Sequence, residues 1–416
     1  MRLAAALPGG GHVLNVCADR YRFTVGFAAA LATNKVSLLP STHTSAVIRD
    51  LATFAPDVFC LTDDPRCEID LPRTLYTESA PTQLWPPPEI DSECLAAYVF
   101  TSGSTGTPLP YKKTWGRLVR CVRDGAEGFG LLDGRSYSFV GTVPPQHMYG
   151  FESTVLVPLQ AGAALCAERP FYPADVCSAL ACVPRPRVLV STPVHLRTLV
   201  TAEVDLPAVD LILSATAPLS QNLAREVEQR FDTHLQEIYG STETGQIATR
   251  RTADTVEWRL WRDVRLTTAA DRTWAAGGHV EQRTPMCDVI EITAEDRFLL
   301  HGRMADLVNI AGKRSSLAYL THQLNAIPGV LDGAFFLRDE SEEASTTGVT
   351  RVAAVVVAPE LDTASLTEQL RRRIDPVFLP RPLLFVDRLP RNDTGKLPHE
   401  ALQALVMNTS RRSADA

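Results

Sequence analysis

Residues 98–115 read YVFTSGSTGTPLPYKKTW, a short apolar run that passes directly into a loop of Thr, Ser and Gly. Gly103 and Gly106 can adopt positive φ, so successive backbone N–H groups can converge on one anion. The loop adds hydroxyl donors at Ser102, Ser104, Thr105 and Thr107. A linker is the alternative, but linkers seldom follow directly on a buried-looking strand. Because no Gly-Lys-Ser/Thr ending follows, this is not a Walker loop. The stretch favours a phosphate-binding loop of another kind.

The composition is that of an ordinary globular protein, with 45% hydrophobic and 21% charged residues in a chain of 416. That length indicates two or three structural units. The formal net charge of −7 offers no bulk attraction to nucleic acid or anionic lipid, so we expect neither as a partner. No apolar run is long enough to span a bilayer, and the opening MRLAAALPGGGH has too short an apolar stretch for a signal peptide.

The nine cysteines are scattered, and no C-x-x-C pair appears. Cys177 and Cys182 are the closest two, and no histidine or second pair beside them completes a zinc-ligand pattern. We therefore expect buried thiols rather than a metal site or a disulfide framework, and a cytoplasmic location.

Short β-branched or aromatic runs alternate with helical patterns through the first three hundred residues, which predicts an α/β fold built in layers. After residue 303 the rhythm restarts on a smaller scale. We expect a large N-terminal layered α/β domain over residues 1–303 and a small, mobile α+β C-terminal domain over residues 304–416. The proline-rich stretch 71–93 and the acidic run 338–348 are interpreted as surface loops. Strands are predicted at 56–62, 95–100, 136–142, 187–192, 210–215, 332–337, 351–358 and 382–387, with C-terminal helices over 315–327 and 364–374.

Five further features follow the loop in order: PPQHMYG (144–150), SATAPLS (214–220), YGSTETG (239–245), Asp288 with Arg303 fifteen positions later, and PRNDTGK (390–396). With TSGSTGTP, they make the chain from about residue 95 to its end resemble the adenylate-forming enzymes. That superfamily includes acyl- and aryl-CoA synthetases, luciferases and the adenylation domains of peptide synthetases. One such match is weak, whereas six in the right order are highly specific.

The resemblance implies where ATP binds. In the family a lysine follows the phosphate loop at once, and the sequence does not decide whether Lys112 or Lys113 takes that place. We include Lys113 in the predicted site. Arg303 offers a bidentate fork for phosphate or ribose, and Asp288 can accept from both ribose hydroxyls. The other implied ATP-binding residues are Thr101, Ser102, Gly103, Ser104, Thr105 and Gly106 for phosphate, and Ala215, Thr216, Ala217, Tyr239, Gly240 and Ser241 for adenine and its surroundings.

The resemblance also implies catalytic residues. Thr242 can donate to the α-phosphate, and the hard carboxylate of Glu243 can hold Mg²⁺ directly or through water. His147, on a rigid loop after two prolines, can present an imidazole to the acid substrate. Lys396, in an Asn-Asp-Thr-Gly turn, is expected to bridge carboxylate and α-phosphate oxygens. Taken singly, each of these residues is more often structural or solvated.

The sequence departs from the family pattern in four places. Leu-Pro-Tyr separates Pro108 from the lysines. Met286-Cys287 precedes Asp288 where Thr-Gly is usual, and Ala305 takes a hinge position where Asp or Lys is typical. The N-terminal part is also shorter than usual. Because that part normally packs around the acid pocket, the identity of the acid stays open.

These features predict an AMP-forming acid–thiol ligase. A small carboxylic acid attacks the α-phosphorus of ATP, and a pantetheine thiol then takes the acyl group from the adenylate. The compact N-terminal part and the PLPYKKTW and NIAGKRSSLAYL segments look most like stand-alone ligases of bacterial pigment and polyketide clusters. That likeness favours an acyl, and especially an aryl, group loaded onto an acyl carrier protein, with residues 371–373 as a candidate docking face. Free coenzyme A is the alternative acceptor, and an inactive nucleotide-binding relative is a third, less favoured hypothesis.

Overall fold

The computed structural model describes residues 2–40, 42–78, 86, 88–101, 109–269, 272–303, 307–310, 313–337, 352–392, 397–398 and 401–407. For Thr101 and Arg303, each the last residue of a strand, it describes the backbone alone. Residues 102–106 of the predicted phosphate loop, Ala305, Lys396 and the acidic run 338–348 lie outside the described residues.

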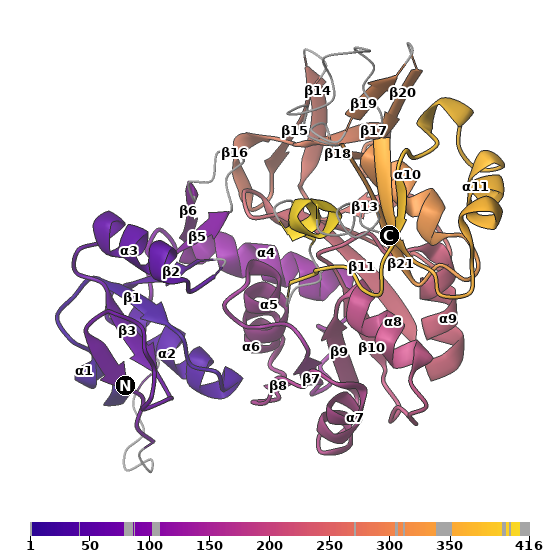
Figure 1. The fold of residues 1–416 in the computed structure, drawn as a ribbon. Helices are drawn as coiled ribbons and strands as arrows, with labels where there is room; N and C mark the ends of the chain where they lie inside the picture. Colours follow the sequence, from indigo (N-terminus) through magenta and orange to yellow (C-terminus); the bar gives the residue numbers. More distant parts are fainter. Residues whose placement is uncertain are drawn as a thin grey trace.

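The first layer is a sheet of order β4-β3-β1-β2-β5-β6, drawn in indigo to purple in Figure 1. Its neighbours are parallel except β5 and β6, which run antiparallel and pair Thr101 with Leu109. The Ser/Gly-rich segment therefore links the two strands of a hairpin. The strands are β1 (His12–Asn15), β2 (Val36–Leu39), β3 (Phe59–Thr62), β4 (Arg73–Leu75), β5 (Leu95–Thr101) and β6 (Leu109–Thr114). The helices are α1 (Arg2–Ala6), α2 (Arg20–Ala32) and α3 (Ser45–Phe54).

The second sheet is larger, with the order β17-β18-β13-β12-β11-β10-β9-β7-β8. From β8 to β11 the neighbours are parallel, and from β11 to β17 they are antiparallel. Strands β7 (Ser138–Gly141), β9 (Arg187–Ser191) and β10 (Leu211–Ser214) are apolar and buried almost throughout, because helices cover parallel strands on both faces. The remaining strands are β8 (Ala164–Leu165), β11 (His234–Ser241), β12 (Gly245–Arg250), β13 (Trp258–Leu260), β17 (Asp288–Ala294) and β18 (Arg297–Arg303).

The helices of this part follow the strands in the α/β rhythm predicted from the sequence. Helix α2 of the first layer also packs here, since the Phe27 ring lies edge-on to that of Phe151 with centroids 4.9 Å apart. One hydrophobic core cluster thus spans both sheets. The helices are α4 (Trp115–Gly128), α5 (Met148–Gly150), the π-helix η1 (Phe151–Leu156), α6 (Val157–Ala161), α7 (Pro173–Ala181), α8 (Pro193–Thr201) and α9 (Gln221–Phe231).

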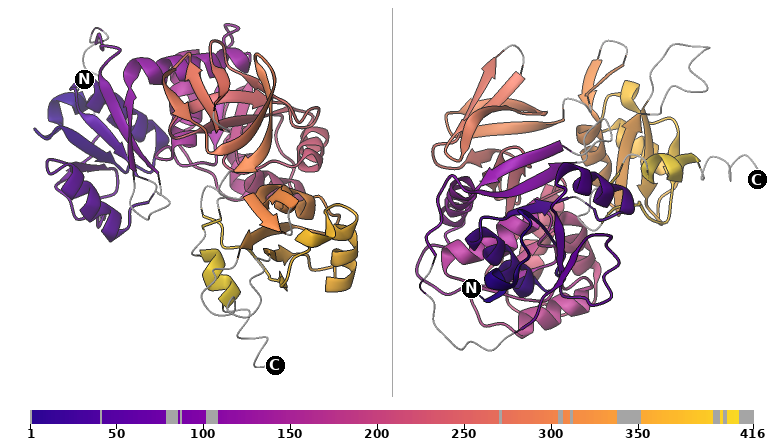
Figure 2. Two further views of the ribbon diagram at one scale, coloured as in Figure 1. Left: turned by 90° about the horizontal axis from the view of Figure 1, so that it is seen from above. Right: turned by 90° about the vertical axis from the view of Figure 1, so that its left-hand side faces the viewer.

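A small antiparallel sheet, β14-β15-β16, precedes β17 in the chain and is the salmon-coloured sheet beside the second layer in Figure 2. Its strands are β14 (Arg265–Ala269), β15 (Arg272–Gly277) and β16 (Val280–Pro285).

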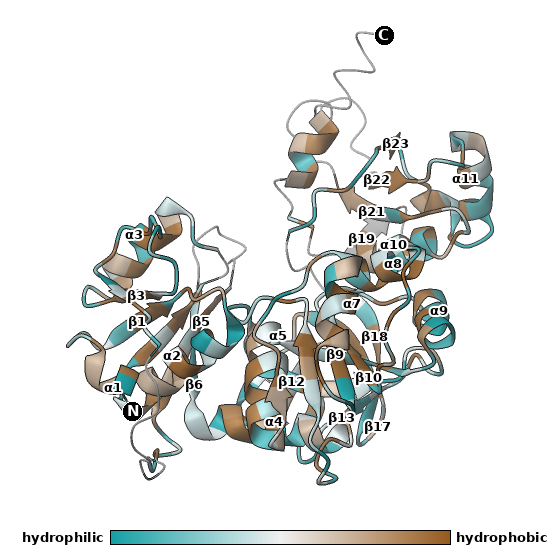
Figure 3. Ribbon diagram, turned by 90° about the horizontal axis from the view of Figure 1, so that it is seen from below, coloured by the Kyte–Doolittle hydropathy of each residue, from teal (hydrophilic) through white to brown (hydrophobic). Residues whose placement is uncertain are grey.

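The C-terminal part, orange to yellow in Figure 2, has a hydrophobic core of its own. Leu320 and Leu324 of α10 and Leu366 and Leu370 of α11 pack there against the sheet β21-β22-β23. In Figure 3 the hydrophobic positions of β21 and β22 lie on the inside of this unit. Its elements are β19 (Leu307–Ile310), β20 (Lys313–Ser316), α10 (Leu317–Asn325), β21 (Asp332–Leu337), β22 (Val352–Val357), α11 (Thr363–Arg371), the 3-10 helix η3 (Pro376–Phe378) and β23 (Leu383–Phe385).

The predicted fold class is confirmed: a large layered α/β part precedes a small α+β part. Each predicted strand and each predicted C-terminal helix overlaps an observed one. The interpretation of 71–93 as loop is wrong at one point, because residues 73–75 form β4, which pairs in parallel with β3 at the sheet edge. The domain boundary after residue 303 stays a prediction. Among the described residues, no helix combines the length and apolar character that crossing a membrane requires.

Candidate functional site

The site is built at the carboxyl ends of the parallel strands β7, β9, β10 and β11. In open α/β sheets, ligands bind in the crevice outside these strand ends. Three of the predicted segments lie at these ends: 144–150 shortly after β7, 214–220 from the last residue of β10, and 239–245 at the end of β11. Because β10 pairs in register with β11, the 214–220 segment and the 239–245 segment leave the sheet side by side.

The segment that presents His147 is held by close backbone packing. A Cβ added at Gly150 would lie 2.0 Å from the carbonyl oxygen of Pro144, so only glycine fits there. The hydroxyl of Tyr149 donates to the carbonyl oxygens of Ser191 and Leu213, each at 3.0 Å, which ties the segment to the ends of β9 and β10. His147 is half-buried and caps α5, its Nδ1 accepting from the Tyr149 N–H at 3.3 Å.

A buried arginine anchors the same segment from the first layer. Arg20, at the start of α2, is 1% exposed, and its guanidinium donates five hydrogen bonds of 2.8–3.0 Å. Burial lowers its pKa to about 10. The acceptors are the Thr154 hydroxyl and the carbonyl oxygens of Gly141, Val143, Cys166 and Glu168. The carbonyls of Gly141 and Val143 lie just before the His147 segment (144–150), so Arg20 fixes where that segment begins.

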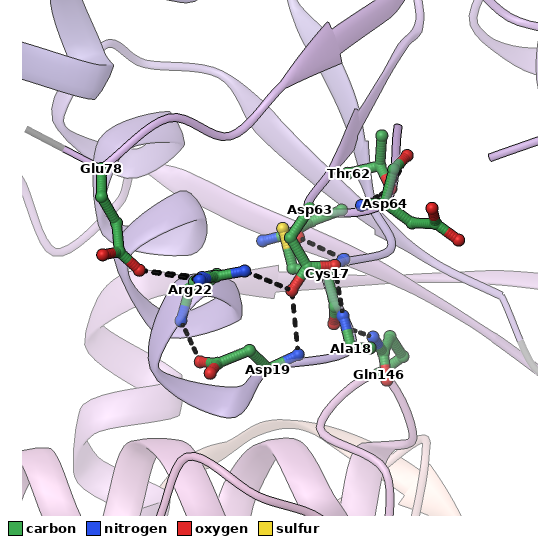
Figure 4. Close-up of polar contacts among 10 residues, drawn as sticks. Cys17, Ala18, Asp19, Arg22, Thr62, Asp63, Asp64, Glu78 and Gln146 are labelled. Carbon is green, nitrogen blue, oxygen red and sulfur yellow. Dashed lines mark hydrogen bonds and ion pairs between the residues drawn. The ribbon is translucent and has the colours of Figure 1, made fainter. Parts of the chain in front are cut away.

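A second link joins the layers at the loop before α2, shown in Figure 4. The Asp63 carboxylate accepts from the backbone N–H groups of Ala18 and Asp19 at 3.0 and 3.1 Å. The amide of Gln146, next to His147, donates to the carbonyl oxygen of Cys17 at 2.9 Å. The His147 segment is therefore tied both to the second sheet and to the first.

The 214–220 segment carries an unusual backbone. Ala215 is buried, Thr216 and Ala217 are half-buried, and Thr216 has φ of 81°. Positive φ is a rare conformation for a β-branched residue, and such outliers cluster at functional sites. The buried Glu237 steadies the segment by accepting from the Leu219 N–H at 3.1 Å.

The turn between β11 and β12 presents Thr242 and Glu243 at its tip, both half-buried. The Oγ atoms of Ser241 and Thr244 lie 3.1 Å apart, and each accepts from the backbone N–H of the other residue at 3.2 Å. Gly240 is required here because an added Cβ would lie 2.2 Å from the Gly245 carbonyl oxygen. The turn is therefore rigid where the catalytic pair is expected.

Tyr239, Asp288 and Arg303 are brought together by β-sheet pairing. The Tyr239 hydroxyl donates to Asp288 Oδ2 at 2.5 Å. Asp288 and Arg303 are direct partners in the antiparallel pair β17–β18, which accounts for their spacing of fifteen positions. The Tyr239 ring packs among Trp258 and Phe298, with centroid distances of 5.4 and 5.5 Å. Adenine stacking on Tyr239 and ribose binding by Asp288 stay predictions.

The two candidate lysines lie on opposite sides of β6. Lys112 is exposed, whereas Lys113 is 4% exposed and its Nζ donates to the backbone carbonyl oxygen of Glu243 at 3.3 Å. Burial lowers the pKa of Lys113, and the nearby charge of Glu152 opposes that shift. The structure thus places Lys113, not Lys112, under the Thr242–Glu243 turn. Its contact with ATP phosphates remains a prediction.

Sequence reasoning missed Arg20, Glu152 and Glu237, each of which is 4% exposed or less. Glu152 lies in η1, five positions after His147, and burial raises the pKa of its carboxyl group to about 7. No local signal marks a buried charge, because a single Arg or Glu in a helix or strand is usually solvated. For Glu152, the one sign of burial in the sequence was its place inside the apolar run FESTVLVP.

No group of three or more His, Cys, Asp or Glu side chains within the described ranges could hold a metal ion. All nine cysteines are free thiols, but the expectation of buried thiols is wrong for most of them: three are buried, namely Cys17, Cys60 and Cys121, while Cys182 and Cys287 are exposed and the other four are half-buried. Metal binding by Glu243 therefore stays a prediction from the sequence. A single carboxylate suits Mg²⁺, which is usually held by one or two carboxylates together with substrate phosphates.

The family model of the AMP-binding enzymes matches residues 12–270. A 4-coumarate–CoA ligase of Rhodobacter capsulatus is 31% identical over 309 residues, which cover 73% of this chain and 75% of that protein. ATP-bound MatB from Rhodopseudomonas palustris is similar with a TM-score of 0.80 at 18% identity, over 97% of this chain and 90% of the other. The o-succinylbenzoate CoA synthetase (MenE) of Bacillus subtilis, in complex with the acyl-adenylate intermediate OSB-AMP, has a TM-score of 0.79 at 17% identity, over the same shares. The chain belongs to the AMP-binding enzyme family and is an adenylate-forming enzyme, an ATP-dependent, AMP-forming acid–thiol ligase.

Proposed function

We propose that the ligase activates a small carboxylic acid, specifically an aryl acid, at the carboxyl edge of β7, β9, β10 and β11. The observation that carries the proposal is the convergence there of the rigid Thr242–Glu243 turn, the Tyr239–Asp288 hydrogen bond and the anchored His147 segment. The name of the R. capsulatus relative, a ligase of 4-coumarate, supports an aryl acid.

In this proposal the residues act mainly by positioning and by neutralising charge. Asp288 orients the ribose, and Thr242 donates to the α-phosphate, whose negative charge grows as the carboxylate attacks. Lys396, in the small C-terminal domain, approaches the same oxygens when that domain closes and withdraws to admit the thiol. His147 borders the incoming acid. Glu243 is the residue that would hold Mg²⁺, and the bound ion supplies charge neutralisation for the departing pyrophosphate.

The acceptor is a pantetheine thiol. A carrier protein as its source was favoured by the sequence, and we keep it as one candidate. Arg371 and Arg372 both approach Glu368, with closest N–O distances of 3.8 and 3.3 Å, so part of the basic docking charge on α11 is offset. Free coenzyme A is the second candidate. It is supported by this pairing, which leaves less positive charge for docking an acidic carrier protein, and by the name of the R. capsulatus relative, a CoA ligase.

The acceptors are separated by reversing the charge of residues 371–373 to glutamate. Docking of an acidic carrier protein predicts slower carrier loading at low ionic strength, with adenylation unchanged. Efficient turnover with free coenzyme A and no response to the reversal would remove the carrier protein from the proposal. The nine free thiols and the membership of this enzyme family support a cytoplasmic site of action.

The adenylation step is tested by acid-dependent pyrophosphate release from Mg-ATP. Glu243→Gln keeps the shape of the turn and removes the carboxylate charge, so the rate should fall on the order of 10²- to 10³-fold. The matched control is Glu203→Gln, an exposed glutamate in the loop after α8. Full activity of Glu243→Gln at limiting Mg²⁺ would show that Glu243 has no metal role.

A further inference from the structure

Lys113 is a buried cation on β6, the edge strand of the first sheet, and it is 4% exposed. A lysine is almost never buried to this extent unless its charge has a partner. Among the described residues, the Lys113 ammonium makes no ion pair, and its one hydrogen bond goes to the backbone carbonyl oxygen of Glu243 at 3.3 Å. The reason for burying this charge therefore lies in that contact and in the groups around it.

The contact lies at the tip of the Thr242–Glu243 turn. Hydrogen bonds between Ser241 and Thr244 close the turn at its base, and they join residues on either side of the tip. In the part of the chain that the structure describes, the one hydrogen bond to Thr242 or Glu243 is the bond that Lys113 donates. Lys113 thus supports the two residues that the proposed mechanism uses.

The contact also connects the two sheets. Lys113 pairs with Ala97 in the β5–β6 hairpin, whose strands the Ser/Gly-rich segment joins. The turn lies 130 positions further along the chain, between β11 and β12 of the second sheet. The methylene stem of a lysine can lie in apolar surroundings while its ammonium reaches a polar group at the far end. Lys113 therefore fixes the position of the Thr242–Glu243 turn relative to the hairpin.

A neighbouring charge makes this burial tolerable. Burial lowers the pKa of Lys113, and the nearby carboxylate of Glu152 raises it. Glu152 is itself 3% exposed, and its Oε1 accepts from the Cys121 thiol at 3.5 Å. An opposite charge favours the charged form of a buried group even where the two groups form no direct ion pair. The ammonium is thus balanced by Glu152, and its donors stay available to the turn.

The same burial argues against a direct contact between Lys113 and ATP. A lysine that binds phosphate as a point charge must be open to the ligand, and this side chain is not. Lys112, on the other side of β6, is exposed. The hydrogen bond to Glu243 gives Lys113 a different use, because it holds a turn whose side chains must meet the reacting phosphate in one geometry.

We propose that Lys113 is a positioning residue for adenylation: its ammonium holds the backbone carbonyl of Glu243, and with it the Thr242–Glu243 turn, and does not bind the phosphates of ATP. The inference rests on the role of that turn in the proposed function. Because a misplacement of about 1 Å can lower a rate on the order of 10²-fold, loss of this contact acts on catalysis. The affinity for ATP does not depend on it.

The first test is Lys113→Met, which keeps the length of the side chain and removes its donors. The kcat of acid-dependent pyrophosphate release should fall on the order of 10²-fold, whereas the Kd for ATP, measured by calorimetry without Mg²⁺, should change less than about threefold. The acid is the one that the wild type uses fastest among benzoates and cinnamates. Lys113→Arg restores a donor to the carbonyl and should recover kcat to within about tenfold of the wild type.

Two comparisons separate positioning from a general structural role. Thioester formation from a prepared acyl adenylate breaks no bond at the phosphorus of ATP, so Lys113→Met should lower its rate less than about threefold. In a Thr242→Ala background, Lys113→Met should lower kcat by at most about tenfold, because a residue through which it acts is already lost. The matched control is Arg120→Met, which removes an exposed cation of α4 that approaches Asp263 at 3.5 Å and should match the wild type.

A Kd for ATP that rises about tenfold or more in Lys113→Met, with the Kd for AMP unchanged, would show a direct phosphate contact and overturn the inference. Equal losses of kcat in Lys113→Met and Lys112→Met, or fully additive losses in the Thr242→Ala background, would overturn it as well. If Lys113→Met does not fold, Lys113→Gln takes its place in the affinity measurements.

Absence of pyrophosphate release by the wild type with every benzoate and cinnamate would instead overturn the proposed function. The affinities of the Lys113 variants for ATP and AMP would then still decide whether this lysine binds phosphate, so the two failures are distinguishable.

Discussion

Arg20 is 1% exposed. Replacing it with methionine removes the guanidinium group, and with it every hydrogen-bond donor of the side chain, but keeps a side chain of similar length. Five acceptors lose a partner: the Thr154 hydroxyl and the carbonyl oxygens of Gly141, Val143, Cys166 and Glu168. At about 1 kcal/mol for each hydrogen bond the loss is about 5 kcal/mol. The depressed pKa of Arg20 shows that burying its charge is itself unfavourable, so part of that loss is returned. We expect a net destabilisation of about 3–4 kcal/mol.

The expected change in melting temperature follows from the chain length. An unfolding entropy of about 2.1 cal/mol/K per residue amounts to about 0.9 kcal/mol/K for 416 residues, so Tm should fall by about 4 °C. The adenylation rate should fall further than stability alone explains, on the order of 10²-fold, because the freed carbonyls of Gly141 and Val143 directly precede the His147 segment. Arg20→Lys keeps a charge but has fewer donors and should give intermediate values.

Arg22→Met is the control, since it changes the same residue type two positions along the same helix. Arg22 is one-third exposed and pairs with Glu78 at 2.8 Å and, more loosely, with Asp63 at 3.8 Å (Figure 4); an exposed pair such as that with Glu78 is worth at most about 1 kcal/mol. Thermal unfolding followed by fluorescence, and pyrophosphate release measured at 25 °C, compare the two variants. Equal melting temperatures and equal rates for Arg20→Met and Arg22→Met would refute the anchoring role of Arg20.

Three further outcomes are expected. Lys396→Ala should reduce acid-dependent pyrophosphate exchange by roughly 10²-fold or more and leave thioester formation from a prepared acyl adenylate largely intact; an equal loss in both half-reactions would contradict the two-conformation mechanism. Tyr239→Phe removes the donor to Asp288 and should raise KM for ATP roughly tenfold with little change in kcat, and an unchanged KM would remove this hydrogen bond from the ribose site. Glu152 holds its proton in the folded protein up to a pKa of about 7, against an ordinary 4.5, so wild-type stability falls as pH rises through that window. The Tm of Glu152→Gln should therefore gain on that of the wild type between pH 4.5 and 7, and a constant difference would show that Glu152 titrates normally.

Much of the fold and of the expected site was predictable because its signals are local. Buried parallel strands such as β9 and β10 are short β-branched runs, and their alternation with helical patterns indicates the layers. Turn chemistry is local too, so YGSTETG predicts a tight, polar turn that the structure bears out with its Ser241–Thr244 hydrogen bonds. The pairing of Asp288 with Arg303 could also have been predicted from the sequence, since an antiparallel hairpin joins residues that are close in the chain.

The sequence by itself determined the fold class, the order of the motifs and membership of an acid-activating family. Only the tertiary structure decided which lysine lies under the Thr242–Glu243 turn, because the choice between Lys112 and Lys113 depends on which face of β6 packs on a turn 130 positions away. It also decided that Arg20 and Glu152 are buried: the hydrogen-bond partners of Arg20 come from segments up to 148 positions distant, and Glu152 of η1 lies beside Cys121 of α4 and Gly245 of β12. Periodicity and turn propensity are set by neighbouring residues and can be read along the chain, whereas burial of a charge depends on how distant elements pack, and no local pattern encodes that.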